Sequence, residues 1–120
     1  MSRALNIIIA VIALEHLCIL VLEMFLWEKQ AGLDAFDQTK AEAASTRVVA
    51  ANQGLYNGFL AAGLFWGLSL SANGTSVKVF FLSCVLIAGL FGAATAKRGQ
   101  PILFLQAIPA ALGLVLVFLS

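Results

Sequence analysis

Four long apolar stretches constrain the fold of this chain more than any other feature of its sequence. They run approximately over residues 4–27, 48–70, 77–96 and 101–119. Each has about 20 residues, and a helix of that length, at about 1.5 Å rise per residue, crosses a hydrocarbon layer roughly 30 Å thick. The pattern predicts a single all-α integral membrane domain over residues 1–120, built as an antiparallel bundle of four transmembrane helices.

The composition favours the same class. Charged residues make up 11% of the chain and hydrophobic residues 62%, whereas an ordinary soluble domain is about a quarter charged. The formal net charge is only +1, so the chain has no basic field that would attract nucleic acid. We therefore expect the lipid bilayer as a partner and no nucleic acid.

The connections predict how the helices are arranged. Those over residues 71–76 and 97–100 are short, which makes the helices on either side antiparallel neighbours. The connection from Glu28 to Arg47 is longer and holds most of the charge. Asp34 followed three residues later by Asp37 resembles a helix start. The second helix is therefore predicted over residues 48–70, with a start as early as about residue 35 if it begins outside the bilayer.

The distribution of basic residues predicts the orientation. The first and third connections carry Lys29, Lys40, Arg47, Lys97 and Arg98, whereas the opposite side carries Arg3 and Lys78. The positive-inside rule then places the first and third connections in the cytoplasm and both termini outside. The first stretch is longer than the apolar region of a signal peptide, so we expect it to be retained. The expected location is the bacterial inner (plasma) membrane, with several passes.

Ionisable side chains indicate where function would lie. Glu15, His16 and Glu23 fall in the first apolar stretch, and the other three stretches contain no acidic residue and no histidine. Burying such groups in hydrocarbon costs several kcal/mol by the lowest estimates, roughly 2.5 to 3.5 kcal/mol each, so their presence indicates use. At about 100° per residue, His16 and Glu23 share one helix face, whereas Glu15 lies about 100° away and would face a neighbouring groove or another subunit.

The second helix carries a polar strip at the matching depth. Asn52 with Tyr56, and Gln53 with Asn57, are i, i+4 pairs. A Glu-to-amide or His-to-phenol hydrogen bond between the first two helices is the simplest arrangement. A structural alternative is that these polar groups only fasten the helices together.

The fourth helix adds a polar group and an interruption. Gln106 reaches a similar depth, and Pro109 lacks the backbone donor that would pair with the carbonyl of Leu105. Such interruptions border binding sites in transporters. The candidates for binding a substrate or a proton are Glu15, His16, Glu23, Asn52, Gln53, Tyr56, Asn57 and Gln106.

Glycines predict where helices approach closely. Gly54 and Gly58, and likewise Gly63 and Gly67, have GxxxG spacing, and Gly89 with Gly92 adds a small surface on the third helix. These residues are candidates for packing within the bundle or in a homodimer, which the spacing permits without requiring it.

The sequence also resembles a known family. The resemblance rests mainly on one run in the second helix, Asn52-Gln53-Gly54-Leu55-Tyr56-Asn57-Gly58-Phe59-Leu60-Ala61-Ala62-Gly63. It is supported by Glu15-His16, Leu22-Glu23-Met24-Phe25 with Trp27, Cys84 with Ala88-Gly89 and Gly92, and Gln106 with Pro109-Ala110. The family comprises short four-span bacterial membrane proteins catalogued as domain of unknown function 1304. One departure is Glu28-Lys29-Gln30, where the resemblance leads us to expect a proline soon after Trp27. The resemblance implies a fold and a location, and it leaves the function open.

Three classes of function are compatible with these residues. The favoured one is small-molecule or proton-coupled transport, in which Glu15 or Glu23 exchanges a proton for a cationic or polar substrate. The alternatives are an intramembrane protein that binds a lipophilic ligand, or an isomerase-like enzyme using Glu and His as acid and base, and a structural or regulatory membrane subunit. A non-enzymatic role is favoured over an enzymatic one.

No cofactor or metal is expected. Glu15, His16 and Glu23 do not have the spacing of an established metal site. The sequence also lacks a phosphate loop, a nucleophile elbow and a haem attachment motif.

Overall fold

The computed structural model describes residues 3–96 and 99–120, with the backbone alone at Gly99 and Gln100. The elements are α1 (Arg3–Met24), α2 (Gln30–Ala35), α3 (Lys40–Ser69), the 3₁₀ turn η1 (Ser71–Gly74), α4 (Thr75–Thr95), α5 (Gly99–Ile102), the π-helical η2 (Leu103–Ala107) and α6 (Ile108–Leu119). The described residues form helices joined by short connections and include no strand. The prediction of an all-α chain is therefore confirmed. Lys97 and Arg98, which contributed to the predicted orientation, lie outside the described residues.

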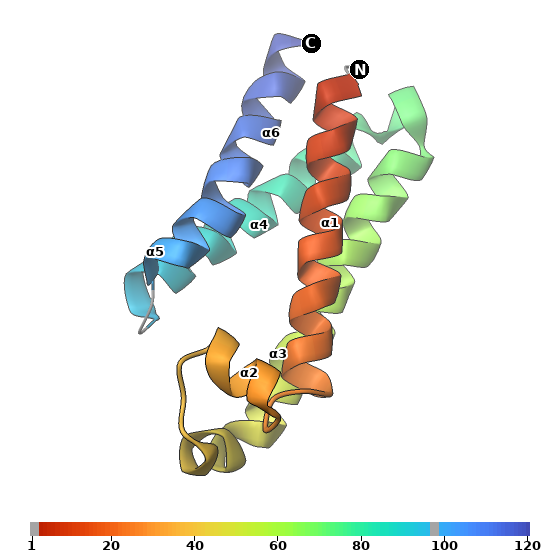
Figure 1. Ribbon diagram of the computed structural model, residues 1–120. Helices are drawn as coiled ribbons and strands as arrows, with labels where there is room; N and C mark the ends of the chain where they lie inside the picture. The colour runs from red at the N-terminus through yellow and green to blue at the C-terminus, as the bar shows by residue number, and fades with distance from the viewer. Residues whose placement is uncertain (1–2, 97–98) are drawn as a thin grey trace.

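The helices form two hairpins. α1 packs against α3, and α4 packs against α5, η2 and α6 (Figure 1). Both termini and η1 lie at one end of the molecule, whereas α2 and the beginning of α3 lie at the other (Figure 1). The hairpins meet near the termini and diverge toward α2 and α5, and the longest extent of the molecule is 48 Å. The polar segment around α2 therefore caps only the α1–α3 hairpin.

The core lies where the two hairpins meet. Its buried side chains are Leu5, Ile9, Ile12 and Ala13 of α1, Leu64 of α3, Leu82 and Val85 of α4, and Ala110 and Val117 of α6. Within α1 the spacing of these residues is that of one helix face, and His16 continues the face. Large apolar side chains also cover the outer faces, where Ile7, for example, is 57% exposed. An outer surface of this kind is expected of helices that face lipid.

The first helix is shorter than its apolar stretch. α1 ends at Met24, whereas the stretch predicts a helix to residue 27. The amides of Phe25 and Leu26 both donate to the carbonyl of Val21, at 3.0 and 3.1 Å, and the chain then turns. The turn brings the indole of Trp27 to α3, where Nε1 donates to the carbonyl of Ala43 at 3.1 Å. Contact with another helix thus overrides the local apolar pattern.

The second long helix begins at Lys40, eight residues before the apolar stretch at residue 48 and five residues after the early start near residue 35. Thr39 and Glu42 form a reciprocal capping box, in which the Glu42 amide donates to Thr39 Oγ1 at 3.1 Å and the Thr39 amide donates to Glu42 Oε1 at 2.8 Å. The Asp34 and Asp37 signal does not start this helix. Asp37 has a φ of 50°, a left-handed conformation that interrupts any helix running through it.

The last apolar stretch is divided into three segments, although its sequence predicts one helix over 101–119. Ile108 donates its amide to the carbonyl of Leu103, five residues back, and closes the π-helical turn η2. Pro109 follows at the start of α6 and has no amide hydrogen to donate. The interruption expected near Pro109 is therefore present, as a π-helical turn.

By length and apolarity, two of the described segments could cross a membrane. They are Arg3–Met24 and Ser71–Thr95, and Leu103–Leu119 is a shorter apolar helix. α3 is less apolar than α1 and α4, because it begins with a polar segment and its middle contains Asn52, Gln53 and Asn57.

Candidate functional site

Glu23 and Asn57 are joined between α1 and α3. The Asn57 amide nitrogen Nδ2 donates to Glu23 Oε1 at 2.6 Å, and it also lies 3.1 Å from the backbone carbonyl of Gln53. Both side chains are half-buried. The Glu-to-amide hydrogen bond expected from the sequence is therefore confirmed, with Asn57 as its amide partner.

Two glycines allow α1 and α3 to come close enough for this bond. A Cβ atom added at Gly54 would lie 2.6 Å from Met24 Cγ and 3.1 Å from Glu23 Cβ. A Cβ at Gly58 would lie 2.7 Å from Leu20 Cδ1. Real Cβ contacts are longer, so a larger residue at either position would make the side chain of Met24 or Leu20 move. Both glycines thus lie at the contact between α1 and α3 within the chain.

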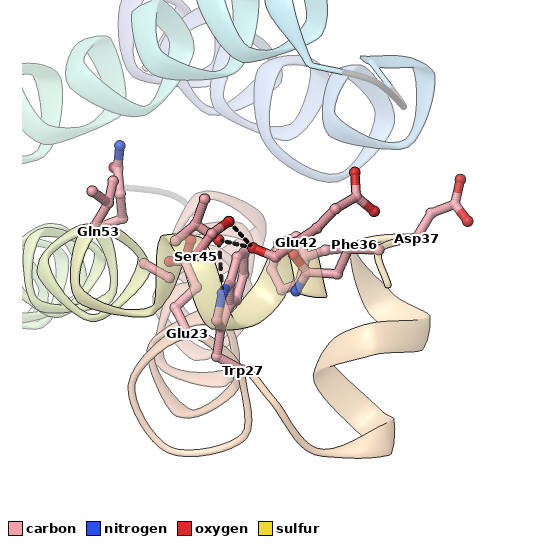
Figure 2. A pocket seen from close by; sticks show the side chains of 11 residues that line it. Glu23, Trp27, Phe36, Asp37, Glu42, Ser45 and Gln53 are labelled. Carbon is pink, nitrogen blue, oxygen red and sulfur yellow. Dashed lines mark hydrogen bonds between the residues drawn. The ribbon is translucent and has the colours of Figure 1, made fainter. Parts of the chain in front are cut away.

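A cavity of about 460 Å³ begins at Glu23 and extends toward the polar end of α3 (Figure 2). We call it the acidic pocket. It is lined by Glu23, Trp27, Phe36, Asp37, Gln38, Glu42, Ser45, Thr46, Val49, Ala50 and Gln53. In Figure 2, Asp37 and Glu42 lie toward one end of this group and Gln53 toward the other. The residues come from α1, the α1–α2 and α2–α3 connections and α3, so the pocket exists only in the folded hairpin.

The chemistry of the acidic pocket favours a cation. Its lining includes three carboxylates, Glu23, Asp37 and Glu42, and no lysine or arginine. The rings of Trp27 and Phe36 have centroids 4.9 Å apart and form one wall. Carboxylates and aromatic faces are the two groups that attract organic cations.

Hydrogen bonds hold the indole wall of the pocket in place. Trp27 Nε1 donates to the Ala43 carbonyl at 3.1 Å. It also donates to Thr46 Oγ1 at 3.2 Å (Figure 2). Gln38 Nε2 is buried and has no hydrogen-bond partner among the described residues. The lining thus combines a fixed aromatic surface with a free amide donor, which a ligand with an acceptor oxygen could use.

His16 is separated from the phenol that the sequence suggested as its partner. His16 is 0% exposed and its Nδ1 lies 2.8 Å from the Ile12 carbonyl, so Nδ1 carries the hydrogen. Its Nε2 is buried without a hydrogen-bond partner among the described residues. Tyr56 is 54% exposed and stacks edge-on with Phe59 instead. The expected His-to-phenol bond is therefore wrong, because Tyr56 lies on the outer side of α3.

The remaining candidates do not gather at one place. Gln53 lines the acidic pocket, whereas Asn52 is exposed. Glu15 is half-buried, and its Oε2 has no partner among the described residues. Gln106 lies in η2, on the other hairpin, and does not line the pocket. Membrane depth alone predicts that all of these side chains converge, but only Glu23, Gln53 and Asn57 lie together. Depth does not determine which side of a helix a residue faces.

The other glycines lie at contacts of α4. An added Cβ at Gly63 would collide with the ring of Phe81, and one at Gly67 would lie 3.0 Å from Lys78 Cγ. At Gly89 it would lie 2.8 Å from the backbone nitrogen of Ala107. At Gly92 it would lie 3.3 Å from Ile102 Cγ2. These glycines also serve contacts within the chain.

Several important residues were not singled out from the sequence. Asp37 and Glu42 line the pocket, but as polar residues of a connection they gave no signal of a site. Lys78 is only 1% exposed, and its Nζ donates to Asn6 Oδ1 at 3.3 Å. Lys78 lies within an apolar stretch, and burying its charge in hydrocarbon is costly for the same reason as burying that of Glu15. Its place in the sequence could therefore have identified it.

The described side chains offer no shared metal site. Among residues 3–96 and 99–120, no three histidine, cysteine, aspartate or glutamate side chains come close enough to hold one ion. Cys18 and Cys84 are free thiols.

Comparison with known proteins agrees with the resemblance seen in the sequence. The chain is 28% identical over 89 residues to Uncharacterized protein YpaA of Lactococcus lactis subsp. lactis (strain IL1403), a match that covers 72% of this chain and 75% of that protein. No solved structure matches the chain. The model of the family described as Protein of unknown function (DUF1304) matches residues 10–118, and the chain therefore belongs to this family.

Proposed function

We propose that this protein is a four-span membrane protein of the bacterial inner membrane that exchanges a proton at Glu23 for a small cationic molecule bound in the acidic pocket. Two segments, Arg3–Met24 and Ser71–Thr95, support two spans directly. α3 has 30 residues and is about 45 Å long at 1.5 Å per residue, so it could cross despite its polar strip. Residues 99–119 are helical throughout and would extend about 30 Å.

The position of Glu23 is the observation that carries the proposal. Its carboxylate lines the acidic pocket and has Asn57 as a hydrogen-bond partner at 2.6 Å, and Glu23 is the next-to-last residue of the apolar helix α1. A half-buried carboxylate can hold a proton or a bound cation. Competition between the two at one group is the simplest means of coupling their movements.

Transport by purified protein tests the proposal. We would reconstitute the protein in liposomes, impose a pH gradient and follow uptake of the fluorescent cation ethidium together with the internal pH. We expect ethidium movement coupled to proton movement in the opposite direction. Glu23→Gln should reduce both to the level of empty liposomes, because an amide cannot exchange a proton at neutral pH.

A matched acidic variant controls for general effects. Glu28 lies five residues from Glu23, outside the acidic pocket, and pairs with Arg47 at 3.6 Å. Glu28→Gln should therefore retain most of the flux. Undiminished flux in Glu23→Gln, or equal losses in both variants, would contradict a proton-exchanging role for Glu23.

A structural role is the second candidate, and the Glu23–Asn57 bond itself favours it. Interhelical hydrogen bonds in membranes contribute about 1 kcal/mol each. If Glu23→Gln lowers thermal stability while ethidium fails to move with the unmodified protein, the bond is a fastener between α1 and α3. Binding of ethidium without any flux would instead indicate a ligand-binding protein.

A further inference from the structure

A second cavity lies beside the acidic pocket and has the opposite chemistry. It has a volume of about 380 Å³ and is lined by Met24, Phe25, Trp27, Glu28, Lys29 and Arg47. We call it the basic cavity. Trp27 lines both cavities.

The charges of the basic cavity favour an anion. Lys29 and Arg47 face one carboxylate, Glu28, so the lining has an excess of one positive charge. Arg47 Nη1 lies 3.6 Å from Glu28 Oε1, and the two side chains are 68% and 41% exposed. Such an exposed pair contributes little energy. The contact with Glu28 leaves other donors of the guanidinium for a second anion, since a guanidinium has five N–H groups.

The other half of the lining is apolar and lies at the end of a candidate span. Met24 is the last residue of α1, and Phe25, which follows it, is 67% exposed. If α1 crosses the bilayer, this end is at the level of the headgroups, where tryptophan and basic side chains are commonly found. The cavity thus has cationic side chains next to apolar ones at the boundary where a lipid presents a phosphate next to an acyl chain.

We propose that the basic cavity binds an anionic phospholipid. Its phosphate would accept hydrogen bonds from Arg47 and Lys29, and the upper part of an acyl chain would lie on Phe25 and Met24. Basic pockets near the cytoplasmic ends of membrane helices recognise anionic headgroups by the same combination. The inference needs membrane insertion of α1 and does not depend on transport or on the acidic pocket.

Fluorescence of Trp27 can test the proposal directly. The chain has two tryptophans, so Trp66→Phe leaves Trp27 as the single emitter. This variant would be reconstituted in phosphatidylcholine bilayers in which a fixed fraction of lipid is replaced by brominated phosphatidylglycerol or by brominated phosphatidylcholine. We expect stronger quenching by the anionic lipid at equal mole fraction, because bromine atoms quench a nearby indole.

Charge variants identify the residues responsible. Lys29→Gln and Arg47→Gln should each lower the preference for phosphatidylglycerol about fivefold, from the roughly 1 kcal/mol that a basic residue contributes near an anionic surface. Lys29→Arg should keep the preference, since it preserves the charge. Lys40→Gln is the matched control, because Lys40 is an exposed residue at the start of α3 that does not line the cavity.

Four outcomes would overturn the proposal. Equal quenching by both brominated lipids, or a preference that survives in the Lys29→Gln, Arg47→Gln double variant, would overturn the proposal. Loss of the preference on adding millimolar inorganic phosphate would also overturn it, because the site would then recognise phosphate without the lipid. Absence of quenching by any brominated lipid would overturn the proposal, because it would show that Trp27 is away from the bilayer. Failure of ethidium transport would not affect the quenching result.

Discussion

At the residue scale, the fate of each polar side chain depends on its helix face more than on its depth. Asn57 and Asn52 belong to the same strip of α3, yet Asn57 donates to Glu23 and Asn52 is exposed. Five residues correspond to about 500° around a helix, or about 140° after one full turn, so the two amides point in different directions. Only one of them can reach α1.

This difference leads to a prediction about stability. Asn57→Ala should lower the free energy of unfolding by about 1 kcal/mol, because it leaves the half-buried Glu23 carboxylate without its amide donor. The measurement is reversible unfolding of the protein in mixed detergent micelles.

Asn52→Ala is the control for that measurement. It removes the same side chain from an exposed position of the same helix, so a change of less than about 0.5 kcal/mol is expected. Equal effects of the two substitutions would show that the Glu23–Asn57 bond adds nothing to the stability of the hairpin.

At the element scale, the close contact between α4 and η2 depends on Gly89. The π-helical turn brings the backbone of Ala107 so near that a Cβ at Gly89 would lie 2.8 Å from its nitrogen. Backbone atoms cannot move aside as a flexible side chain can. The π-helical turn next to Pro109 can therefore pack this closely against α4 only because residue 89 is a glycine.

Gly89→Ala should destabilise the α4–α6 hairpin by about 1 to 3 kcal/mol, the usual cost of overpacking a tight contact. Gly92→Ala should cost clearly less, since its new Cβ would meet only the side chain of Ile102 at 3.3 Å. Thermal unfolding of both variants in the same detergent compares them. A larger loss in Gly92→Ala would contradict the role given to the η2 backbone.

At the scale of the whole molecule, both ends of the chain lie on the side of η1, and α2 lies at the far end of the α1–α3 hairpin (Figure 1). A bundle of this form inserted in a membrane would expose the two sides to different compartments. The first connection carries Lys29, Lys40 and Arg47, against Arg3 and Lys78 on the opposite side, which favours a cytoplasmic location for α2.

Cysteine labelling of intact cells tests the orientation. In a background with Cys18→Ala and Cys84→Ala, we expect Asn73→Cys and Ser120→Cys to react with a membrane-impermeant maleimide. Asp34→Cys should react only after the cells are permeabilised. All three positions are exposed, so access to the thiol would depend on the compartment.

The opposite labelling pattern would reverse the orientation without affecting the fold. Labelling of Asn73→Cys and Asp34→Cys from the same side would contradict the proposed crossing by α3.

Much of the architecture could be predicted from the sequence because it depends on local properties. Long apolar stretches interrupted by short polar connections dictate helices, and the backbone of such helices satisfies its own hydrogen bonds. The sequence predicts that α3 can start before its apolar stretch, near residue 35, whereas the Thr39–Glu42 capping box that fixes the start at Lys40 is seen only in the structure. The apolar pattern places Trp27 inside the first helix, and contacts with α3 hold it in a turn instead.

The sequence by itself determined that the chain is helical, that its acidic and histidine side chains in the apolar stretches occur in the first one, and that glycines would mark its close contacts. Only the tertiary structure decided that Glu23 meets Asn57, that His16 is buried apart from Tyr56, and that Asp37 and Glu42 join Glu23 in a pocket. The physical reason is that helix formation and burial preference are properties of neighbouring residues. The partner of a polar side chain depends on the rotation of each helix about its axis, which packing between distant segments sets.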